Sequence, residues 1–124
     1  TKFYYIRVYQ NAVEIKDVDS GQIIKRNSSN YFSSKRMLLA DFEIAEQFFR
    51  SVIEEFEGPK IITPSMYIVM QPMELIDGGL CSVEKRAFRD SAEHCGARQV
   101  AIVNHTRYLS SDEFKKAFKN SEYN

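Results

Sequence analysis

The chain has 124 residues, which is enough for one domain with a modest core. Its 17 basic and 17 acidic side chains give a formal net charge of zero, so the chain as a whole has no electrostatic attraction to nucleic acid or to an anionic membrane. With 44% hydrophobic and 27% charged residues it has the composition of a globular protein, which excludes disorder over most of its length.

The start of the chain predicts a meander of three antiparallel strands. Residues 3–9 alternate between two faces, with Tyr4, Ile6 and Val8 on one face and Tyr5, Arg7 and Tyr9 on the other. Residues 12–18 alternate again, with Val13, Ile15 and Val18 on one face and Glu14, Lys16 and Asp17 on the other. A turn at residues 19–21 leads into a third strand that starts at residues 22–25.

A polar segment and a helix follow the meander. Residues 26–36 are basic and rich in Ser and Asn, and we interpret them as a mobile loop. Asp41 is suited to be the N-cap of a helix over residues 42–57, in which apolar side chains recur at helical spacing. Gly58 and Pro59 are expected to end this helix.

The next two predicted elements are a strand and a helix. The apolar run 65–71 is typical of a buried central strand. After a loop, Ser82 is expected to cap a helix that runs to about Cys95, and Gly96 is suited to end it. The side chains of this helix that we expect to face the core are Val83, Ala87, Phe88, Ala92 and Cys95.

The end of the chain predicts one more strand and one more helix. Residues 98–103 form a second buried apolar run. Ser110 and Glu113 have the spacing of a capping box and open a last helix. Its inward side chains are expected to be Phe114, Ala117 and Phe118. The tail, residues 120–124, is expected to fray.

The predicted order of elements is β-β-β-α-β-α-β-α. Three antiparallel strands followed by two βα-linked strands make a five-stranded mixed sheet with helices on its faces. The chain has no internal repeat and no segment with the composition of a linker. We therefore expect a single α/β domain over residues 1–124.

Cysteine placement and hydropathy bear on the compartment. Cys81 and Cys95 lie near opposite ends of one predicted helix, about 20 Å apart, which is too far for a disulfide. Free thiols suit a reducing compartment. No signal peptide is recognisable, and no apolar run approaches the roughly 18 residues of a membrane span. We therefore expect a cytoplasmic protein without a membrane span.

Short motifs for metal or anion binding are weak. No zinc-ligand spacing connects the four residues that could bind a transition metal, namely Cys81, His94, Cys95 and His105. Residues 17–21 resemble the start of a calcium loop, but their glycine comes one residue early, and a hairpin turn fits better. Gly78 and Gly79 precede a predicted helix N-terminus, where an anion could bind, although a flexible loop is the simpler interpretation. We expect no metal and no catalytic nucleophile.

Two groups of basic and aromatic residues have the chemistry to contact single-stranded nucleic acid. The group in the polar loop is Tyr31, Phe32, Lys35 and Arg36. The group on one face of the first strand is Tyr5, Arg7 and Tyr9. Because the net charge is zero, a solvated loop and an ordinary packed strand are the favoured interpretations.

Two longer stretches carry more information than these patterns. Residues 38–57 read LLADFEIAEQFFRSVIEEFE, and residues 83–104 read VEKRAFRDSAEHCGARQVAIVN. Both resemble the bacterial actin-like proteins that determine rod shape, the MreB family. The corresponding family patterns are close to G-V-I-A-D-F-E-V-T-E and V-E-K-R-A-V-R-E-A-A-E-x-A-G-A-R. Residues 66–71 before Pro72 also suit the family's V-V-V-x-V-P strand, and the likeness extends over most of residues 3–109.

The resemblance implies an actin-like half-domain, because this region of the family is its first, ribonuclease-H-like subdomain. The sequence differs from the family patterns at positions that the resemblance assigns to the ATP site. Where the family has a phosphate loop of the form D-x-G-T-A-N-T, residues 6–12 place Arg7 near the aspartate and Tyr9 near the glycine. A tyrosine side chain blocks the close approach of backbone to phosphate that glycine permits.

The family's I-E-E-P motif, which supplies a carboxylate that positions the attacking water, is also altered. It corresponds to residues 103–106, Val-Asn-His-Thr, and neither Asn104 nor His105 restores the carboxylate. The second phosphate loop, the adenine-binding half and a small inserted subdomain of the family have no counterpart in this sequence. We therefore expect no ATPase activity, no tight nucleotide binding and no cofactor.

Three hypotheses remain open. The first is a non-catalytic interaction module that binds an actin-like cell-shape protein, or a second copy of the chain, through the outward faces of helices 41–57 and 82–95. Its candidate residues are Glu43, Glu46, Arg50, Glu54, Glu84, Lys85, Arg89, Asp90 and Glu93. The second is a nucleic-acid-binding ribonuclease-H fold that uses residues 26–36 and lacks nuclease activity, because its first strand has no acid. The third is a fragment of a longer actin-like gene.

Overall fold

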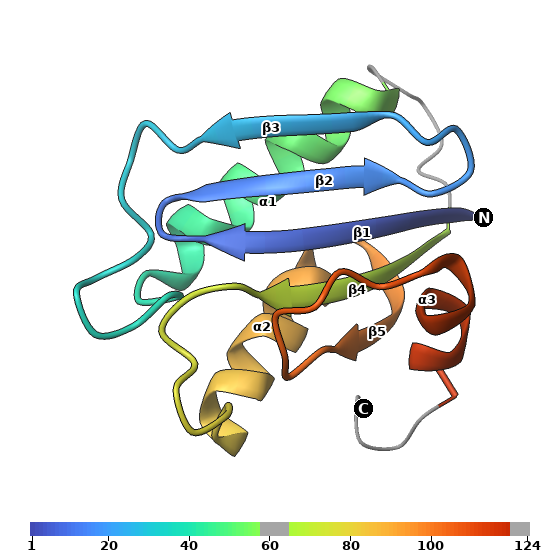
Figure 1. Cartoon of the computed structure of the whole chain (residues 1–124). Coiled ribbons are helices and arrows are strands. Elements are labelled where there is room, and N and C mark those ends of the chain that lie inside the picture. The colour runs from blue at the N-terminus through green and yellow to red at the C-terminus, as the bar shows by residue number, and fades with distance from the viewer. Residues whose placement is uncertain (58–64, 120–124) are drawn as a thin grey trace.

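The computed structural model in Figure 1 describes residues 1–57 and 65–119. Its elements are β1 (Lys2–Tyr9), β2 (Ala12–Asp17), β3 (Ile23–Asn27), α1 (Phe42–Glu57), β4 (Met66–Pro72), α2 (Ser82–His94), β5 (Ala97–Ile102) and α3 (Ser111–Ala117). This order is the predicted one, and the α/β fold class is confirmed. Across the two described ranges, no helix has the length and apolarity needed to cross a membrane.

The five strands form one mixed sheet in the order β3-β2-β1-β4-β5. β1 pairs antiparallel with β2 and parallel with β4, while β2 and β3 are antiparallel and β4 and β5 are parallel. Ile6 lies opposite Ile15 on one side and Met70 on the other, so the middle of the sheet is apolar. The architecture is consistent with an actin-like half-domain.

Helices cover both faces of the sheet, but unequally. α1 and α2 lie on one face and α3 lies on the other (Figure 1). The larger core, under α1 and α2, contains Ile6 of β1, Phe49 of α1 and Phe88 of α2. The smaller core, under α3, joins Tyr5 of β1 to Phe114 and draws its other buried strand residues from β4 and β5. On the α3 side, no helix of the described residues lies over β2 and β3 (Figure 1).

The end of β2 differs from the prediction, which placed Val18 on the same face as Val13 and Ile15, and Asp17 on the opposite face. Strict alternation puts Asp17 on the same face as Ile15, and its side chain is buried. The carboxylate is satisfied there, because it accepts a hydrogen bond from the backbone N–H of Asp19 at 3.1 Å and pairs with Lys2 at 3.3 Å. Val18 packs instead against the core under α3.

The polar segment after the meander is shorter and better packed than predicted. Residues 26–27 belong to β3. Phe32 has no exposed surface, and its ring stacks on that of Phe48 with centroids 5.7 Å apart. Its carbonyl accepts the backbone N–H of Ala40 at 2.8 Å. The expectation of a solvated loop is therefore wrong for Phe32, which is not available to stack on a base.

Two predicted helix starts are confirmed. Asp41 caps α1, because its carboxylate accepts a backbone N–H of the first turn at 3.1 Å. Ser110 and Glu113 form the expected capping box of α3, with hydrogen bonds of 3.2 and 3.0 Å. The predicted helix end at residues 58–59 and the predicted frayed tail at residues 120–124 lie outside the described residues.

The start of α2 corrects the prediction in two respects. The N-cap is Cys81 rather than Ser82, and the backbone N–H of Cys81 donates to the Glu84 carboxylate at 3.1 Å. Val83, predicted to face the core, is 71% exposed. The face that the helix buries is marked instead by Phe88, with Ser91 and Ala92 in the following turn.

Candidate functional site

The turn between β1 and β2 stands where the resemblance places a phosphate loop. The backbone N–H of Gln10 donates to the Glu74 carboxylate at 3.0 Å. The next N–H, of Asn11, donates to the Ser33 hydroxyl at 3.1 Å, and the Ser33 N–H donates back to the Asn11 side chain at 2.8 Å. Asn11 has a φ of +53°, which asparagine tolerates better than most residues. Two backbone donors of the turn are thus occupied by side chains of the chain itself.

Arg7 lies next to this turn, where the resemblance implies an aspartate. Its guanidinium pairs with Glu14 on β2 at 3.5 Å, and Glu14 also approaches Lys25 on β3 at 3.8 Å. The guanidinium carbon lies 5.0 Å from the ring centre of Tyr108 and 6.0 Å from that of Tyr9. A cation fixed in this position repels the divalent metal that an aspartate would attract.

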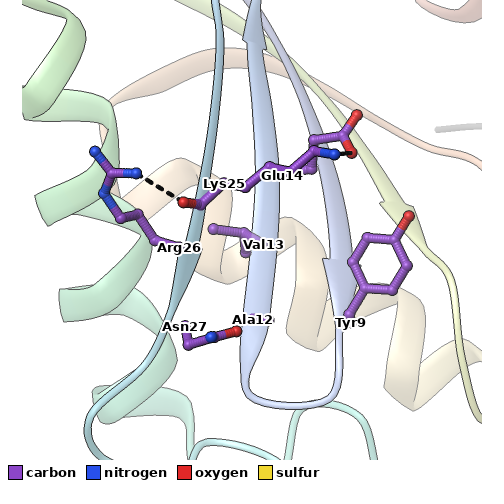
Figure 2. A pocket seen from close by; sticks show the side chains of 7 residues that line it. All are labelled: Tyr9, Ala12, Val13, Glu14, Lys25, Arg26 and Asn27. Carbon is purple, nitrogen blue, oxygen red and sulfur yellow. Dashed lines mark hydrogen bonds and ion pairs between the residues drawn. The ribbon is translucent and has the colours of Figure 1, made fainter.

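A shallow hollow of about 310 Å³ lies beside the same turn (Figure 2). Its lining side chains on the α3 side of the sheet are Tyr9, Ala12, Glu14, Lys25 and Asn27. Figure 2 shows Lys25 extending across β2 toward the Glu14 carboxylate. The hollow is therefore polar and charged, and it has a tyrosine where a phosphate loop needs a glycine.

The segment after β5 has Asn104 and His105 in place of the family's carboxylates. The Asn104 side-chain oxygen accepts the backbone N–H of Leu80 at 2.9 Å. A Cβ added to Gly79 would lie 3.2 Å from the Asn104 side-chain nitrogen, and Gly79 has a φ of +90°, so glycine is required there. Asn104 therefore holds the loop before α2. Gly78 and Gly79 belong to this loop and were considered as an anion-binding site. The Leu80 N–H of the loop is already bonded to Asn104.

A buried hydrogen-bond network that sequence analysis missed lies on the α3 side. The side-chain amide of Gln71, on β4, donates to the carbonyls of His105 at 2.7 Å and Arg107 at 2.8 Å. Its oxygen accepts the Tyr5 hydroxyl, which in turn accepts the backbone N–H of Leu109 at 3.1 Å. Tyr5, a predicted nucleic-acid contact, is 3% exposed. A glutamine inside an apolar strand was the sequence signal that could have identified this network.

His105 belongs to the segment that Gln71 holds. Burial lowers the pKa of His105, and the positive charge of Arg107 adds to the effect. The Nδ1 atom of His105 accepts the backbone N–H of Arg107 at 3.2 Å, and Nε2 is buried without a hydrogen-bond partner among the described residues. The folded chain therefore favours the neutral imidazole.

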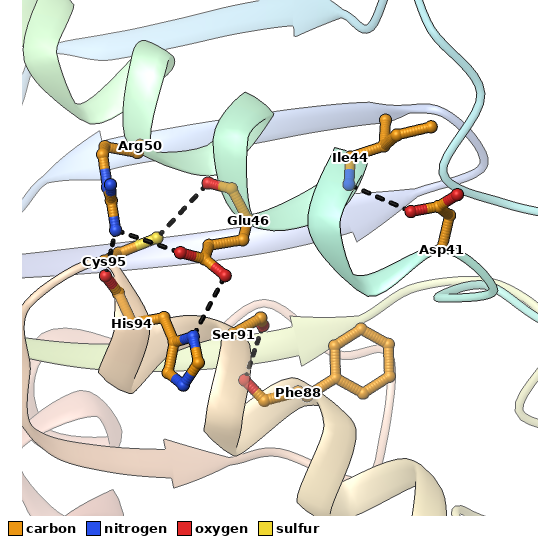
Figure 3. A network of polar contacts seen from close by, with 8 residues as sticks. All are labelled: Asp41, Ile44, Glu46, Arg50, Phe88, Ser91, His94 and Cys95. Atoms are coloured by element: carbon orange, nitrogen blue, oxygen red, sulfur yellow. Dashed lines mark hydrogen bonds and ion pairs between the residues drawn. The ribbon is translucent and has the colours of Figure 1, made fainter.

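A second polar network joins α1 to α2 (Figure 3). The Glu46 carboxylate accepts a hydrogen bond from Arg50 at 3.1 Å and lies 3.0 Å from Nδ1 of His94. Arg50 also donates to the His94 carbonyl at the end of α2. Glu46 and Arg50 were predicted as outward interaction residues. The structure shows that they link the two helices, and the Glu46 side chain is only 18% exposed.

The two cysteines lie at opposite ends of α2 as free thiols, as predicted. Cys81 is exposed, whereas Cys95 is buried and its thiol donates to the Glu46 carbonyl at 3.7 Å. Burial raises the pKa of Cys95 to about 12, which makes it a poor nucleophile. Within residues 1–57 and 65–119, no three His, Cys, Asp or Glu side chains gather closely enough to hold a metal ion.

The other predicted interaction residues lie on the same two helices. The exposed ones are Glu43 and Glu54 of α1 and Glu93 of α2. The partly exposed ones are Glu84, Lys85, Arg89 and Asp90 of α2. Some of these have partners, since Arg89 donates to the Val100 carbonyl at 3.2 Å and Asp90 lies 3.8 Å from Arg86. Charged groups that remain in contact with water contribute little binding energy on their own.

Two exposed apolar side chains adjoin this charged surface. Val83 is 71% exposed and Met37 is 44% exposed. They line a small groove of about 30 Å³, whose other lining residues are Leu38, Leu39, Glu84, Ala87 and Phe88. Sequence analysis missed them, because helical spacing places Val83 four residues before Ala87 on the face assigned to the core. We refer to Val83 and Met37 as the apolar pair.

Two known proteins, YjaA and MreB, are similar in sequence to this chain. No protein-family model matches the chain. YjaA of Escherichia coli, described as uncharacterized, is 27% identical over 91 residues, which are 69% of this chain and 70% of YjaA. The cell shape-determining protein MreB of Escherichia coli, and that of Salmonella typhimurium, are 27% identical over 88 residues, or 68% of this chain. Those residues span only 24% of MreB, so the chain is similar to about a quarter of that protein at low identity.

Proposed function

We propose that this chain is a non-catalytic actin-like half-domain that acts as a protein-interaction module and binds a bacterial actin-like cell-shape protein. The observation that carries the proposal is the 27% identity to MreB over 68% of the chain. The five-stranded mixed sheet is also of the kind that the family resemblance implies. A surface retained from an actin-like ancestor is a natural contact for a protein of the same kind.

The absence of catalysis is part of the proposal and is supported by the β1–β2 turn. Arg7 brings a positive charge to the position of the implied aspartate, and Tyr9 brings a ring to the position of the implied glycine. The Gln10 N–H is already bonded to the Glu74 carboxylate. A phosphate oxygen could reach this N–H only by displacing the Glu74 carboxylate, which would remain close by and repel it.

The apolar pair supplies the centre of the proposed interface. Protein interfaces take most of their binding energy from a few apolar side chains near the middle of the contact, surrounded by a polar rim. Val83 and Met37 are exposed beside an apolar groove. Charged groups of α1 and α2, such as Glu43 and Lys85, provide the rim.

Co-sedimentation with purified, assembled MreB tests the proposal. We expect the wild-type chain to pellet with the MreB polymer and the Val83→Asp variant to stay in the supernatant. Val83 is in the first turn of α2, where an aspartate is favoured by the helix dipole, so the variant should remain folded. The matched control is Ile23→Asp, an exposed apolar residue on β3 with its side chain on the opposite side of the sheet.

Three outcomes are informative. Pelleting of the wild-type chain and of Ile23→Asp, but not of Val83→Asp, supports the proposed surface. Equal pelleting of all three chains contradicts the role of Val83 but retains an actin-like partner. If no chain pellets with MreB, the proposed partner is wrong, and sedimentation equilibrium of the chain alone then shows whether a second copy is the partner instead.

A further inference from the structure

Within residues 1–57 and 65–119, no helix lies over half of the sheet face on the α3 side. The core under α3 contains buried strand residues from β1, β4 and β5, whereas β2 and β3 lie open on this side (Figure 1). The side chains of Glu14, Lys16 and Lys25 point to this face by strand alternation. The open half-face lies on the opposite side of the sheet from α1 and α2, so a ligand bound there would not compete with the proposed partner.

The open half-face carries two lysines and one glutamate, with Ala12, Ile23 and Asn27 as its uncharged side chains. In one row across the strands, Lys25 lies opposite Glu14, and Glu14 lies opposite Arg7. In the next row, Lys16 lies opposite Tyr5. Arg7 and Lys25 both approach the Glu14 carboxylate, at 3.5 and 3.8 Å, and Lys16 adds a further cation in the next row, so these three cations outnumber the one carboxylate.

Aromatic rings lie among these cations. Tyr108 is 46% exposed, and its ring centre is 5.0 Å from the Arg7 guanidinium and 5.8 Å from the Lys16 ammonium. The ring also packs against Tyr5 with centroids 5.2 Å apart, so it is held in a fixed position. Tyr9 lines the hollow that adjoins Lys25 (Figure 2).

We propose that this open half-face binds single-stranded nucleic acid. Proteins that bind single strands without sequence preference combine cations that follow the phosphates with aromatic rings on which bases stack. Lys16 and Lys25 supply the cations beside the Arg7–Glu14 ion pair, and Tyr108 supplies the exposed ring.

The chemistry favours single strands over duplexes and over acidic proteins. Bases in a duplex are stacked on each other and cannot reach Tyr108, whereas a single strand exposes them. An acidic peptide would use the lysines but would leave the exposed ring without a stacking partner. The site also differs from the loop at residues 26–36, where Phe32 is buried.

Fluorescence anisotropy with a labelled oligothymidylate and a labelled oligouridylate of about 20 nucleotides tests this proposal on the full chain. We expect saturable binding at about 50 mM salt. The affinity should fall with salt at a logarithmic slope of about −1.4, since each of the two lysine contacts with a phosphate of a single strand contributes about −0.7. Tyr108→Ala should weaken binding about fivefold or more, because a base–aromatic stack is lost.

The decisive comparison uses two charge-matched double variants. Lys16→Glu with Lys25→Glu reverses two charges on the open half-face, and Lys35→Glu with Arg36→Glu reverses two exposed charges outside it. The first should lose about tenfold or more in affinity and most of its salt dependence, while the second should bind within about threefold of wild type. If the first variant does not fold by circular dichroism, Lys16→Gln with Lys25→Gln replaces it, with a smaller loss in the same direction.

The contrary results are equally specific. Equal losses in both double variants would mean that only the overall charge matters, and the proposal would be wrong. Loss in the Lys35 and Arg36 variant alone would place the site in the polar segment. No saturable binding at about 50 mM salt, or binding of a labelled polyglutamate peptide in place of the oligonucleotides, would also overturn it.

Discussion

The Glu74 carboxylate accepts a hydrogen bond from the backbone N–H of Gln10 at 3.0 Å. Glu74 follows β4 and Gln10 follows β1, so the bond ties the end of one strand to the turn at the end of its parallel neighbour. In the family that the sequence resembles, this turn is the first phosphate loop. Here the Glu74 carboxylate accepts a backbone N–H that a bound phosphate would need, so this N–H has its hydrogen-bond partner within the chain.

The first prediction concerns this bond. Glu74→Ala should lower the free energy of unfolding by about 1 kcal/mol, the net contribution of a single hydrogen bond. Glu74→Gln keeps an oxygen acceptor of the same reach and should recover most of the loss. Urea denaturation of the three chains measures both effects. A Gln variant as unstable as the Ala variant would show that the bond depends on the charge of Glu74 and not on its acceptor oxygen.

The second prediction concerns the buried amide of Gln71. Gln71→Leu leaves the carbonyls of His105 and Arg107 and the hydroxyl of Tyr5 without their partner. The Tyr5 hydroxyl is buried and the two carbonyls are partly buried, and an unsatisfied buried group costs about 1–3 kcal/mol, so we expect a loss of about 2 kcal/mol or more by chemical denaturation.

The control for Gln71 is Gln99→Leu, an exposed position on the neighbouring strand β5. Because its amide is in contact with water, this substitution should change the free energy of unfolding by no more than about 0.5 kcal/mol. If Gln71→Leu were as mild as the control, the network would not be what holds the segment after β5 against the sheet.

The third prediction is a pH dependence. Burial and the charge of Arg107 make the pKa of His105 lower in the folded chain than its ordinary value of 6.5. The unfolded chain therefore binds more protons as the pH falls below about 6.5, and acidification destabilises the fold. We expect thermal stability to decrease from pH 7.5 to pH 5.5.

His105→Asn tests the origin of this slope. The asparagine oxygen can replace Nδ1 as acceptor for the Arg107 N–H, and the variant does not titrate in this range. Its melting temperature should change less between pH 7.5 and pH 5.5 than that of the wild type. The control variant His94→Asn removes the other histidine. It should keep the part of the pH dependence of the melting temperature that His105 contributes. Glu113, whose pKa is lowered, titrates below its ordinary value of 4.5 and so acts outside this window. If the melting temperature of His105→Asn depends on pH as strongly as that of the wild type, a group other than His105 causes the effect.

Periodicity predicted the elements well because it follows directly from burial. The alternation of Tyr4, Ile6 and Val8 corresponds to the face of β1 in the larger core, and the order of all the described strands and helices followed from such patterns. The errors fall where a local pattern has two interpretations. Val83 has the spacing of a core residue, but it precedes the first turn that reaches the sheet.

Polar groups in the core were the larger failure of sequence analysis. Asp17 and Gln71 are buried because specific partners satisfy them, and those partners are distant in sequence or belong to the backbone. Phe32 was hidden in a segment whose composition is that of a loop. For the candidate site, the sequence identified Arg7 and Tyr9 through the family resemblance, whereas Glu74 and Tyr108 became apparent only from the fold.

The central claim of the proposed function is that the chain binds no nucleotide at its β1–β2 turn. Calorimetric titration of ATP into the full chain, with and without magnesium, tests this claim most directly. Because Arg7, Tyr9 and the Glu74–Gln10 bond occupy the turn, we predict no saturable heat up to millimolar ATP in either condition. Magnesium-dependent binding in the micromolar range would contradict the claim and would identify a working nucleotide site.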